Sequence, residues 1–262
     1  MGDPYRSGMG IPTALISLVL ATTPQLTFVR DGWISDANGR LARGDAPTWS
    51  RDGKLAFVRD RWIHVASFGR IARGDAPAWS PDGTRLAFGR DGEIFTIDAD
   101  GRNLRRVTRR NARWNEDRSP SWTPDGARLV FGSNRAGVFN QELYAVGASG
   151  GPLTRLTHTA GSETVPGDDG MPSVSPDGTQ VAFVSNRDRR FELYTARIDG
   201  SGQGRLTHTP RVDEALPRWS PDGQAIAYEA TAAGDGASIW VYTIATSSFR
   251  RVGPGTAPAW RP

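Results

Sequence analysis

Short runs of apolar residues, each following a turn that contains Asp-Gly, recur along most of this chain. The runs are three or four residues long and rich in aliphatic and aromatic side chains. That length and composition are typical of β-strands bounded by tight turns. The five clearest runs are Leu55–Val58, Leu86–Phe88, Leu129–Phe131, Val181–Phe183 and Ile226–Tyr228. The pattern predicts an all-β protein.

An eight-residue motif precedes each of these runs. In Ala76–Gly83 it is Ala-Pro-Ala-Trp-Ser-Pro-Asp-Gly, in which proline presets φ for a type I turn and glycine takes the left-handed position. The motif therefore predicts a hairpin turn. Its copies begin 30 to 52 residues apart, a spacing that indicates a repeat architecture. The other copies are Ala46–Gly53, Ser119–Gly126, Met171–Gly178 and Leu216–Gly223, with a truncated one at Ala257–Pro262.

Each repeat has the pattern of a four-stranded blade. In the third unit the strands expected after the motif are Leu86–Phe88, Ile94–Ile97 and Leu104–Thr108. Proline cannot donate to a strand ladder, so we expect each motif proline to be the first residue of an edge strand. The innermost strand of a propeller blade is such an edge.

The two ends of the chain complete one another. The N-terminal unit has strands expected at Leu26–Val29, Trp33–Ser35 and Arg40–Ala42 but no motif strand before them. The C-terminal copy, Ala257–Trp260, supplies a strand without a blade. Pairing the two closes a ring and removes exposed edges. We predict a six-bladed β-propeller of four-stranded blades, closed by the C-terminal strand.

Composition and charge narrow the class of protein. The 262 residues suffice for one repeat domain, and the absence of cysteine excludes disulfides and thiolate metal sites. The formal net charge is +4, carried almost wholly by arginines that alternate with aspartates in expected turns, as at Arg30-Asp31. Such alternation favours solvated turns over a nucleic-acid footprint. We expect a monomer that binds no nucleic acid.

Residues 1–24 differ from the repeats. Arg6 precedes the apolar run Ile11–Ala21, which ends in an acceptable cleavage pattern, and this arrangement resembles a secretory signal peptide. The run is short for a membrane span. The alternative is a disordered or vector-derived tail. We expect residues 25–262 to form an exported propeller, periplasmic or secreted, with no integral membrane segment in the mature chain.

The expected loops differ between the two faces of the ring. Turns within the motif are short, whereas blade connections and second-to-third-strand hairpins lengthen in the later units. Long loops on one face of a rigid scaffold are typical of binding surfaces, so we predict a protein or peptide partner there. The long segments are Arg109–Arg118, His158–Gly170, His208–Ala215, Ser133–Asn140, Ser185–Arg190 and Ala230–Ala237.

Acidic residues recur on this predicted binding face, mostly just before the motif proline. We predict that they lie near the channel mouth and contact a basic partner segment or a hard cation such as calcium. The alternative is that each one caps its own loop through the backbone. The candidates are Asp45, Asp75, Asp117, Glu163, Asp168, Asp169, Asp213 and Glu214.

A basic run lies in the segment that precedes the fourth motif copy. Arg109, Arg110, Arg113 and Trp114 are candidates for a protein or glycan contact, with a solvated outer strand as the alternative.

Catalytic patterns are weak. Gly147–Gly151 matches G-x-S-x-G but follows a strand into another strand, whereas a nucleophile elbow leads into a helix. His158 and His208 occupy equivalent positions in adjacent repeats, and a metal site there needs added carboxylates. We expect no catalytic residues and no cofactor. The alternative is a lyase or hydrolase-like propeller enzyme that acts on an acidic sugar or peptide with a divalent metal near the channel mouth.

The complete repeat resembles the TolB-type propeller family. The similarity rests on Pro-x-Trp-Ser-Pro-Asp-Gly, a Leu-Ala-Phe-like strand, an Arg-Asp-Gly or Ser-Asn-Arg turn, and a closing Arg-Leu-Thr at Arg155–Thr157 and Arg205–Thr207. It covers Leu26 to Trp260. The resemblance implies an exported propeller that binds partner proteins. We expect the propeller alone, without the α/β domain that precedes it in TolB or the catalytic domain of related hydrolases, so a Tol–Pal role is not implied.

Overall fold

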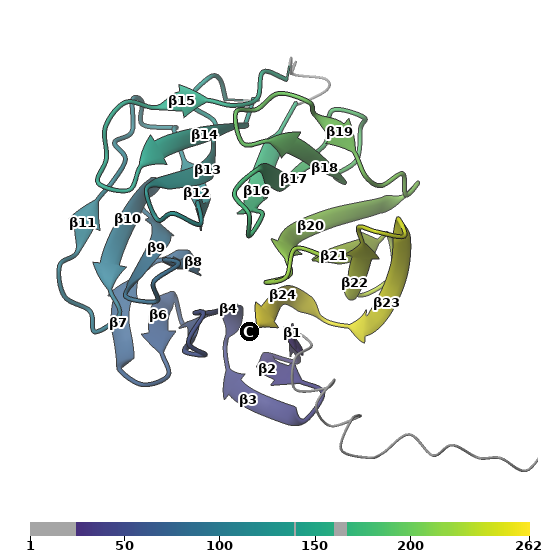
Figure 1. The fold of residues 1–262 in the computed structure, drawn as a ribbon, viewed down its shortest axis with the longest axis horizontal. Helices are drawn as coiled ribbons and strands as arrows, with labels where there is room; N and C mark the ends of the chain where they lie inside the picture. Colours follow the sequence, from purple (N-terminus) through teal and green to yellow (C-terminus); the bar gives the residue numbers. More distant parts are fainter. Residues whose placement is uncertain (1–24, 139, 160–166) are drawn as a thin grey trace, which may run out of the picture.

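The chain forms a ring of six four-stranded antiparallel sheets around a central channel (Figure 1). The computed structural model describes residues 25–138, 140–159 and 167–262, and none of these residues is helical. The predicted six-bladed propeller is confirmed. The signal-peptide prediction for residues 1–24 and the candidate Glu163 lie outside the described residues. No helix in the described part of the chain is long and apolar enough to cross a membrane.

The blades follow the chain in order, and their strands are numbered as in Figure 1. Blade 1 consists of β24 (Thr256–Arg261), β1 (Gln25–Arg30), β2 (Trp33–Asp36) and β3 (Gly39–Arg43). Blade 2 consists of β4 (Asp45–Trp49), β5 (Leu55–Arg59), β6 (Trp62–Val65) and β7 (Gly69–Arg73). Blade 3 consists of β8 (Asp75–Trp79), β9 (Arg85–Arg90), β10 (Glu93–Asp98) and β11 (Arg105–Arg106).

The second half of the ring repeats this order with longer loops. Blade 4 consists of β12 (Asp117–Trp122), β13 (Arg128–Ser133), β14 (Glu142–Gly147) and β15 (Thr154–Arg155). Blade 5 consists of β16 (Asp169–Val174), β17 (Gln180–Ser185), β18 (Glu192–Arg197) and β19 (Gly204–Arg205). Blade 6 consists of β20 (Val212–Trp219), β21 (Ala225–Ala232), β22 (Ser238–Thr243) and β23 (Ser248–Pro254).

The C-terminal strand closes the ring as the sequence predicts. Strand β24 lies beside β1 and pairs antiparallel with it (Figure 1). In this pairing Leu26 lies opposite Trp260. The buried Thr27 hydroxyl donates a hydrogen bond of 2.9 Å to the Ala259 carbonyl across this seam. Blade 1 is therefore built from both ends of the described chain, with β1 paired on both sides and β24 as the inner edge strand.

The motif turns form as predicted. In the third unit the Gly83 amide donates to the Ser80 carbonyl at 2.9 Å, and the Ser80 hydroxyl donates to Asp82 at 2.5 Å. The hydrogen bond from Ser80 holds the pKa of the Asp82 carboxyl below its usual value. These contacts recur in the other motif copies, for example between Ser175 and Asp177.

The position of the motif proline differs from the sequence prediction. The proline lies on an edge strand, as expected, but it is not the first residue of that strand, since β8 begins two residues earlier at Asp75. The residue before each proline has φ between 45° and 53°, and the register shifts at this point. A β-bulge therefore accommodates the proline. The bulge interrupts the ladder of hydrogen bonds at this point, so the backbone N–H that proline lacks is not required there.

The outer strand of blade 3 is also shorter than predicted. We expected Leu104–Thr108, but β11 contains Arg105 and Arg106 alone. Thr108 leaves the ladder because its side-chain oxygen accepts a hydrogen bond of 2.9 Å from the Ile94 amide. A threonine that bonds the backbone in this way ends regular pairing.

The core lies between blades and is tied together near the channel. Phe88, Phe131 and Phe183 are fully buried in successive blades. On the inner strands, the Trp122 indole donates to the Ala78 carbonyl of the preceding blade at 3.1 Å, and Trp79 makes the equivalent bond to Thr48 at 3.3 Å. The motif tryptophans therefore link neighbouring blades as well as filling space.

Glycine is required where the first blades join without a loop. A Cβ on Gly74, the single residue between β7 and β8, would lie 2.4 Å from the Phe88 ring and 2.7 Å from the Gly89 carbonyl oxygen. We expect Gly74→Ala to lower the free energy of unfolding by about 1–3 kcal/mol, the usual effect of forcing an extra methyl group into a packed core. Urea denaturation measures this difference in the free energy of unfolding. The matched control is Gly204→Ala, where a Cβ meets nothing within 4 Å; equal losses for both would contradict the steric argument.

Candidate functional site

One face of the ring carries the three longest loops, and we call it the long-loop face. It contains the blade connections and the hairpins between the second and third strands. In blades 1 to 3 these hairpins have two residues each, and the connections that enter the same blades are the single glycines 255, 44 and 74. In blades 4 to 6 they lengthen to 107–116, 134–141, 156–168, 186–191, 206–211 and 233–237.

The sequence suggests uniformly tight turns on the opposite face, but the loops there vary in length. Its loops contain two to six residues, for example 37–38 in blade 1 and 99–104 in blade 3. Three of the lengthened loops of the long-loop face, 186–191, 206–211 and 233–237, therefore fall within the same size range. The difference between the faces comes from 107–116, 134–141 and 156–168, which border blades 3, 4 and 5.

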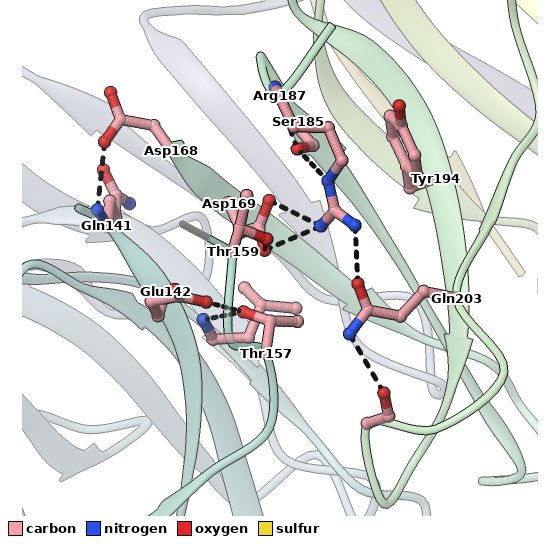
Figure 2. Close-up of polar contacts among 12 residues, drawn as sticks. Gln141, Glu142, Thr157, Thr159, Asp168, Asp169, Ser185, Arg187, Tyr194 and Gln203 are labelled. Carbon is pink, nitrogen blue, oxygen red and sulfur yellow. Dashed lines mark hydrogen bonds and ion pairs between the residues drawn. The ribbon is translucent and has the colours of Figure 1, made fainter. Parts of the chain in front are cut away.

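Buried ion pairs anchor these long loops in blades 4 and 5. In blade 5 the Asp169 carboxylate is completely buried, and Arg187 donates to both of its oxygens at 2.9 Å (Figure 2). The same guanidinium donates to the Ser185 hydroxyl at 2.8 Å and to Gln203 at 2.7 Å. Its carbon lies 4.7 Å from the centre of the Tyr194 ring.

Blade 4 repeats this arrangement. Arg135 donates to both oxygens of the buried Asp117 at 2.7 Å, and its guanidinium carbon lies 5.5 Å from the Tyr144 ring centre. The Ser133 hydroxyl also donates to Asp117, at 2.6 Å. In both blades a single guanidinium nitrogen, Nη2, donates to both carboxylate oxygens, and such charge-assisted hydrogen bonds are stronger than neutral ones. The paired loops therefore rest on a rigid base.

The asparagine of each Ser-Asn-Arg triplet holds the incoming connection. Asn134 accepts a hydrogen bond of 2.7 Å from the Glu116 amide, and Asn186 accepts one of 2.7 Å from the Asp168 amide. The sequence analysis treated these triplets as turns and missed this role. The available signal was the triplet's occurrence twice, each time with an acid three residues before a motif proline.

A second buried acid lies beside each pair. Glu142 is fully buried and accepts a hydrogen bond of 2.6 Å from Arg155. The Thr157 hydroxyl also donates to Glu142 (Figure 2). Burial raises the pKa of this carboxyl above its usual value, although the bonds from Thr157 and Arg155 oppose the shift. In blade 5, Glu192 accepts the equivalent hydrogen bond from Arg205, at 3.0 Å.

The predicted acidic residues separate into two groups. Asp117, Asp169 and Glu214 are buried and bonded to internal donors. The others reach the surface or accept local bonds: Asp45 accepts its neighbour's amide at 2.6 Å, Asp75 is exposed, Asp168 accepts the Gln141 amide at 3.0 Å, and Asp213 pairs with Arg190 at 2.9 Å. The second group is therefore open to a partner at the surface, and Glu214 of the first group also lines a pocket.

These carboxylates do not converge on one point. Among residues 25–138, 140–159 and 167–262, no group of three or more His, Asp or Glu side chains is close enough together to hold a metal ion. His158 is exposed, and His208 lies against the Arg205 side chain. Ser149 of the G-x-S-x-G match lies in the loop between β14 and β15, which is not followed by a helix.

The basic candidates are brought together. Arg109, Arg110, Arg113 and Trp114 are all exposed in the 107–116 connection. The Trp114 side chain is a large apolar group at the surface, while its carbonyl accepts a hydrogen bond of 3.2 Å from Asn134. The loop is therefore fixed at this point with its tryptophan facing solvent.

Two hollows open on the ring. The channel forms a cavity of about 570 Å³ lined by the Pro-x-Trp-Ser-Pro segments of the inner strands. The second, which we call the blade 6 pocket, is about 790 Å³ and lies at the long-loop end of blade 6, where its lining includes His208, Glu214, Tyr228, Trp240 and Arg251. Apart from His208 and Glu214, these residues were not predicted as site residues.

Comparison with known proteins identifies the type of propeller. Residues 59–167 match the model of the TolB beta propeller domain family. A TolB homolog from Chlorobaculum tepidum is 34% identical over 88 residues, 32% of this chain and 20% of the relative. Tricorn protease homolog 1 from Streptomyces coelicolor is 39% identical over 56 residues, and an uncharacterized Agrobacterium fabrum protein is 32% identical over 88. The matches span 5% and 29% of those two proteins and 21% and 34% of this chain.

Solved structures agree on the fold. A putative TolB from Agrobacterium tumefaciens has a TM-score of 0.71 at 19% identity, covering 90% of this chain and 92% of that one. TolB from Acinetobacter baumannii has a TM-score of 0.69 at 25% identity, covering 91% and 67%. An oligogalacturonate lyase in complex with manganese has a TM-score of 0.51 at 18% identity, covering 78% and 63%.

Proposed function

Since the chain forms a TolB-type β-propeller, we propose that it is a non-catalytic, exported scaffold that captures a protein or peptide partner on the long-loop face. The observation that carries the proposal is that the three longest loops share this face and rest on buried arginine–carboxylate pairs. Loops held on a rigid base lose little conformational entropy on binding, which favours their use in recognition.

The exposed groups on this face suit a protein surface. Trp114 is 44% exposed beside three exposed arginines, and the Asp213 side chain is 45% exposed. Aromatic and arginine side chains are enriched at protein interfaces and often dominate their binding energy. The buried Asp117 and Asp169, in contrast, are already paired with Arg135 and Arg187, which supports a structural role for these two acids rather than general acid–base chemistry.

Capture by paired variants tests the proposal. We expect Trp114→Ala with Asp213→Lys to reduce recovery of the specific partner from a periplasmic extract at least tenfold. The matched control on the opposite face is Phe68→Ala with Asp199→Lys, because Phe68 is 54% exposed and Asp199, like Asp213, accepts one backbone amide. The captured partner is then titrated against each purified variant. Equal affinity for both double variants would contradict binding through the long-loop face.

Export is tested separately. The apolar run Ile11–Ala21 supports a signal peptide, so the N-terminus of the protein recovered from the periplasm or medium is expected to begin near residue 22. Recovery of the whole protein in the cytoplasm with residues 1–24 intact would contradict it.

A further inference from the structure

Blade 6 has the backbone register of blades 4 and 5 but lacks their ion pairs. In blade 4, Asp117, Ser133 and Glu142 lie opposite one another across β12, β13 and β14. In blade 5 the same row is Asp169, Ser185 and Glu192. In blade 6 it is Glu214, Ala230 and Ser238. The acid on the first strand is kept, whereas the serine and the second acid are replaced.

The arginine of the ion pair is also missing from blade 6. Arg135 and Arg187 follow the row's serine by two residues, and the residue two positions after Ala230 is Ala232. The aromatic row on which those arginines pack remains: Phe183 opposite Tyr194 in blade 5 corresponds to Tyr228 opposite Trp240 in blade 6. An aromatic platform and a carboxylate are therefore present without their guanidinium.

The blade 6 pocket occupies the place of the missing side chains. Ala230, Ala232 and Ser238, the three replaced positions, all line it, together with Glu214, Tyr228 and Trp240. Its volume of about 790 Å³ is within the range of pockets that hold small ligands or peptide side chains. The replacement of serine, arginine and glutamate by the smaller Ala230, Ala232 and Ser238 thus leaves an open pocket on the long-loop face.

The charges left in the pocket define what fits it. Glu214 is 1% exposed and accepts bonds from the Leu193 amide at 2.9 Å, the Thr209 hydroxyl at 2.9 Å and the Thr207 hydroxyl. Within the described residues no arginine, lysine or histidine nitrogen lies within 4.0 Å of its carboxylate. A buried carboxylate without a cation is a favourable partner for one.

The outer strand shows the complementary change. Arg251 lies opposite Trp240, as Arg205 lies opposite Tyr194 in blade 5. Arg205 bonds the buried Glu192, but Arg251 donates to the Ser238 hydroxyl at 2.8 Å instead. Blade 6 therefore lacks one guanidinium and one carboxylate, and a ligand that carries both restores the charge balance of blades 4 and 5.

We propose that the blade 6 pocket binds an arginine side chain accompanied by a carboxylate, as at the C-terminal arginine of a peptide. The guanidinium pairs with Glu214 and packs on Tyr228 and Trp240, as Arg187 pairs with Asp169 and packs on Tyr194. The ligand carboxylate meets Arg251. This inference rests on the proposed function, in that it names a peptide feature recognised on the long-loop face.

Titration of the intact protein with Nα-acetyl-L-arginine tests the pocket by calorimetry or NMR. We expect saturable binding, at least tenfold weaker binding of Nα-acetyl-L-citrulline, which lacks the charge, and at least tenfold weaker binding of Nα-acetyl-L-arginine amide, which lacks the carboxylate. Citrulline binding as tight as arginine binding, or no saturable binding of Nα-acetyl-L-arginine, would overturn the proposal.

Two variants locate the binding. Ala230→Ser with Ala232→Arg restores the Ser-x-Arg pattern of blades 4 and 5 and is expected to occupy the pocket and reduce binding at least tenfold while Glu214 stays in place. Glu214→Gln is expected to reduce it at least tenfold by removing the charge, and it tests the pocket even if the double variant fails to fold. Unchanged binding in Glu214→Gln, or in a folded double variant, would show that the ligand binds elsewhere.

The two proposals fail in different ways. Phe68→Ala with Asp199→Lys serves again as the distant control and is expected to bind Nα-acetyl-L-arginine normally. If the Trp114 and Asp213 variant captures its partner normally while Glu214→Gln loses the arginine ligand, the scaffold proposal fails and the pocket stands. If the Trp114 and Asp213 variant loses its partner while Glu214→Gln binds the arginine ligand normally, the scaffold proposal stands and the pocket proposal fails.

Discussion

Replacing Arg187 by leucine is expected to lower the free energy of unfolding by about 3–5 kcal/mol, because it leaves a buried carboxylate without its cation. Asp169 is 0% exposed, and Arg187 supplies bonds to both of its oxygens. Among the residues that the structure describes, the side-chain donor to Asp169 that remains in Arg187→Leu is the Thr159 hydroxyl, at 2.8 Å. Urea denaturation at pH 7 measures the loss.

A neighbouring arginine provides the control. Arg190 pairs with Asp213 at the same 2.9 Å, but the two side chains are 49% and 45% exposed. Because water screens such a pair, Arg190→Leu is expected to cost less than about 1 kcal/mol. Adding Asp169→Leu to Arg187→Leu removes the stranded charge and is expected to recover most of the stability. Equal losses for Arg187→Leu and Arg190→Leu would contradict the role assigned to burial.

Deleting Thr256–Pro262 is expected to abolish cooperative folding. The deletion removes β24, so β1 keeps β2 as its single partner and the Thr27 hydroxyl loses the Ala259 carbonyl. It also removes the Trp260 indole that donates to the Arg218 carbonyl of blade 6 at 2.9 Å. We expect a loss of at least about 5 kcal/mol, which is comparable to the whole stability of a marginal domain. Circular dichroism during heating is expected to show no cooperative transition.

A circular permutant separates lost pairing from lost length. Since Gln25 lies opposite Arg261, a short loop can join residue 262 to residue 25, with the new ends placed between Gly255 and Thr256. This chain keeps β24 in blade 1 and is expected to unfold cooperatively. A deletion variant as stable as the full chain would show that β24 does not close the ring.

The fold was predictable because each copy of the repeated motif marks one blade. Pro-x-Trp-Ser-Pro-Asp-Gly specifies a turn and an edge strand through local chemistry, so its six positions count the blades. Local details were less predictable. The left-handed backbone before each proline, at Ala76 for example, depends on pairing with the second strand, and the early end of β11 depends on the contact between Thr108 and Ile94.

The site was less predictable, because its chemistry depends on partners distant in sequence. Asp117 and Asp169 resemble surface acids in the sequence, yet each is buried under an arginine 18 residues further along the chain. The blade 6 pocket is defined by the side chains that Ala230, Ala232 and Ser238 lack. That difference becomes visible once strand register places these residues opposite Glu214 and Trp240.

Mapping a bound peptide tests the central claim most directly. Peptides are selected from a display library on the intact protein, and the tightest binder is studied by hydrogen–deuterium exchange. We predict slowed exchange in the 107–116, 206–211 and 233–237 loops, with no change in the motif turns such as residues 80–83. Slowed exchange confined to the motif turns, with the loops of blades 4 to 6 unaffected, would contradict recognition through the long-loop face.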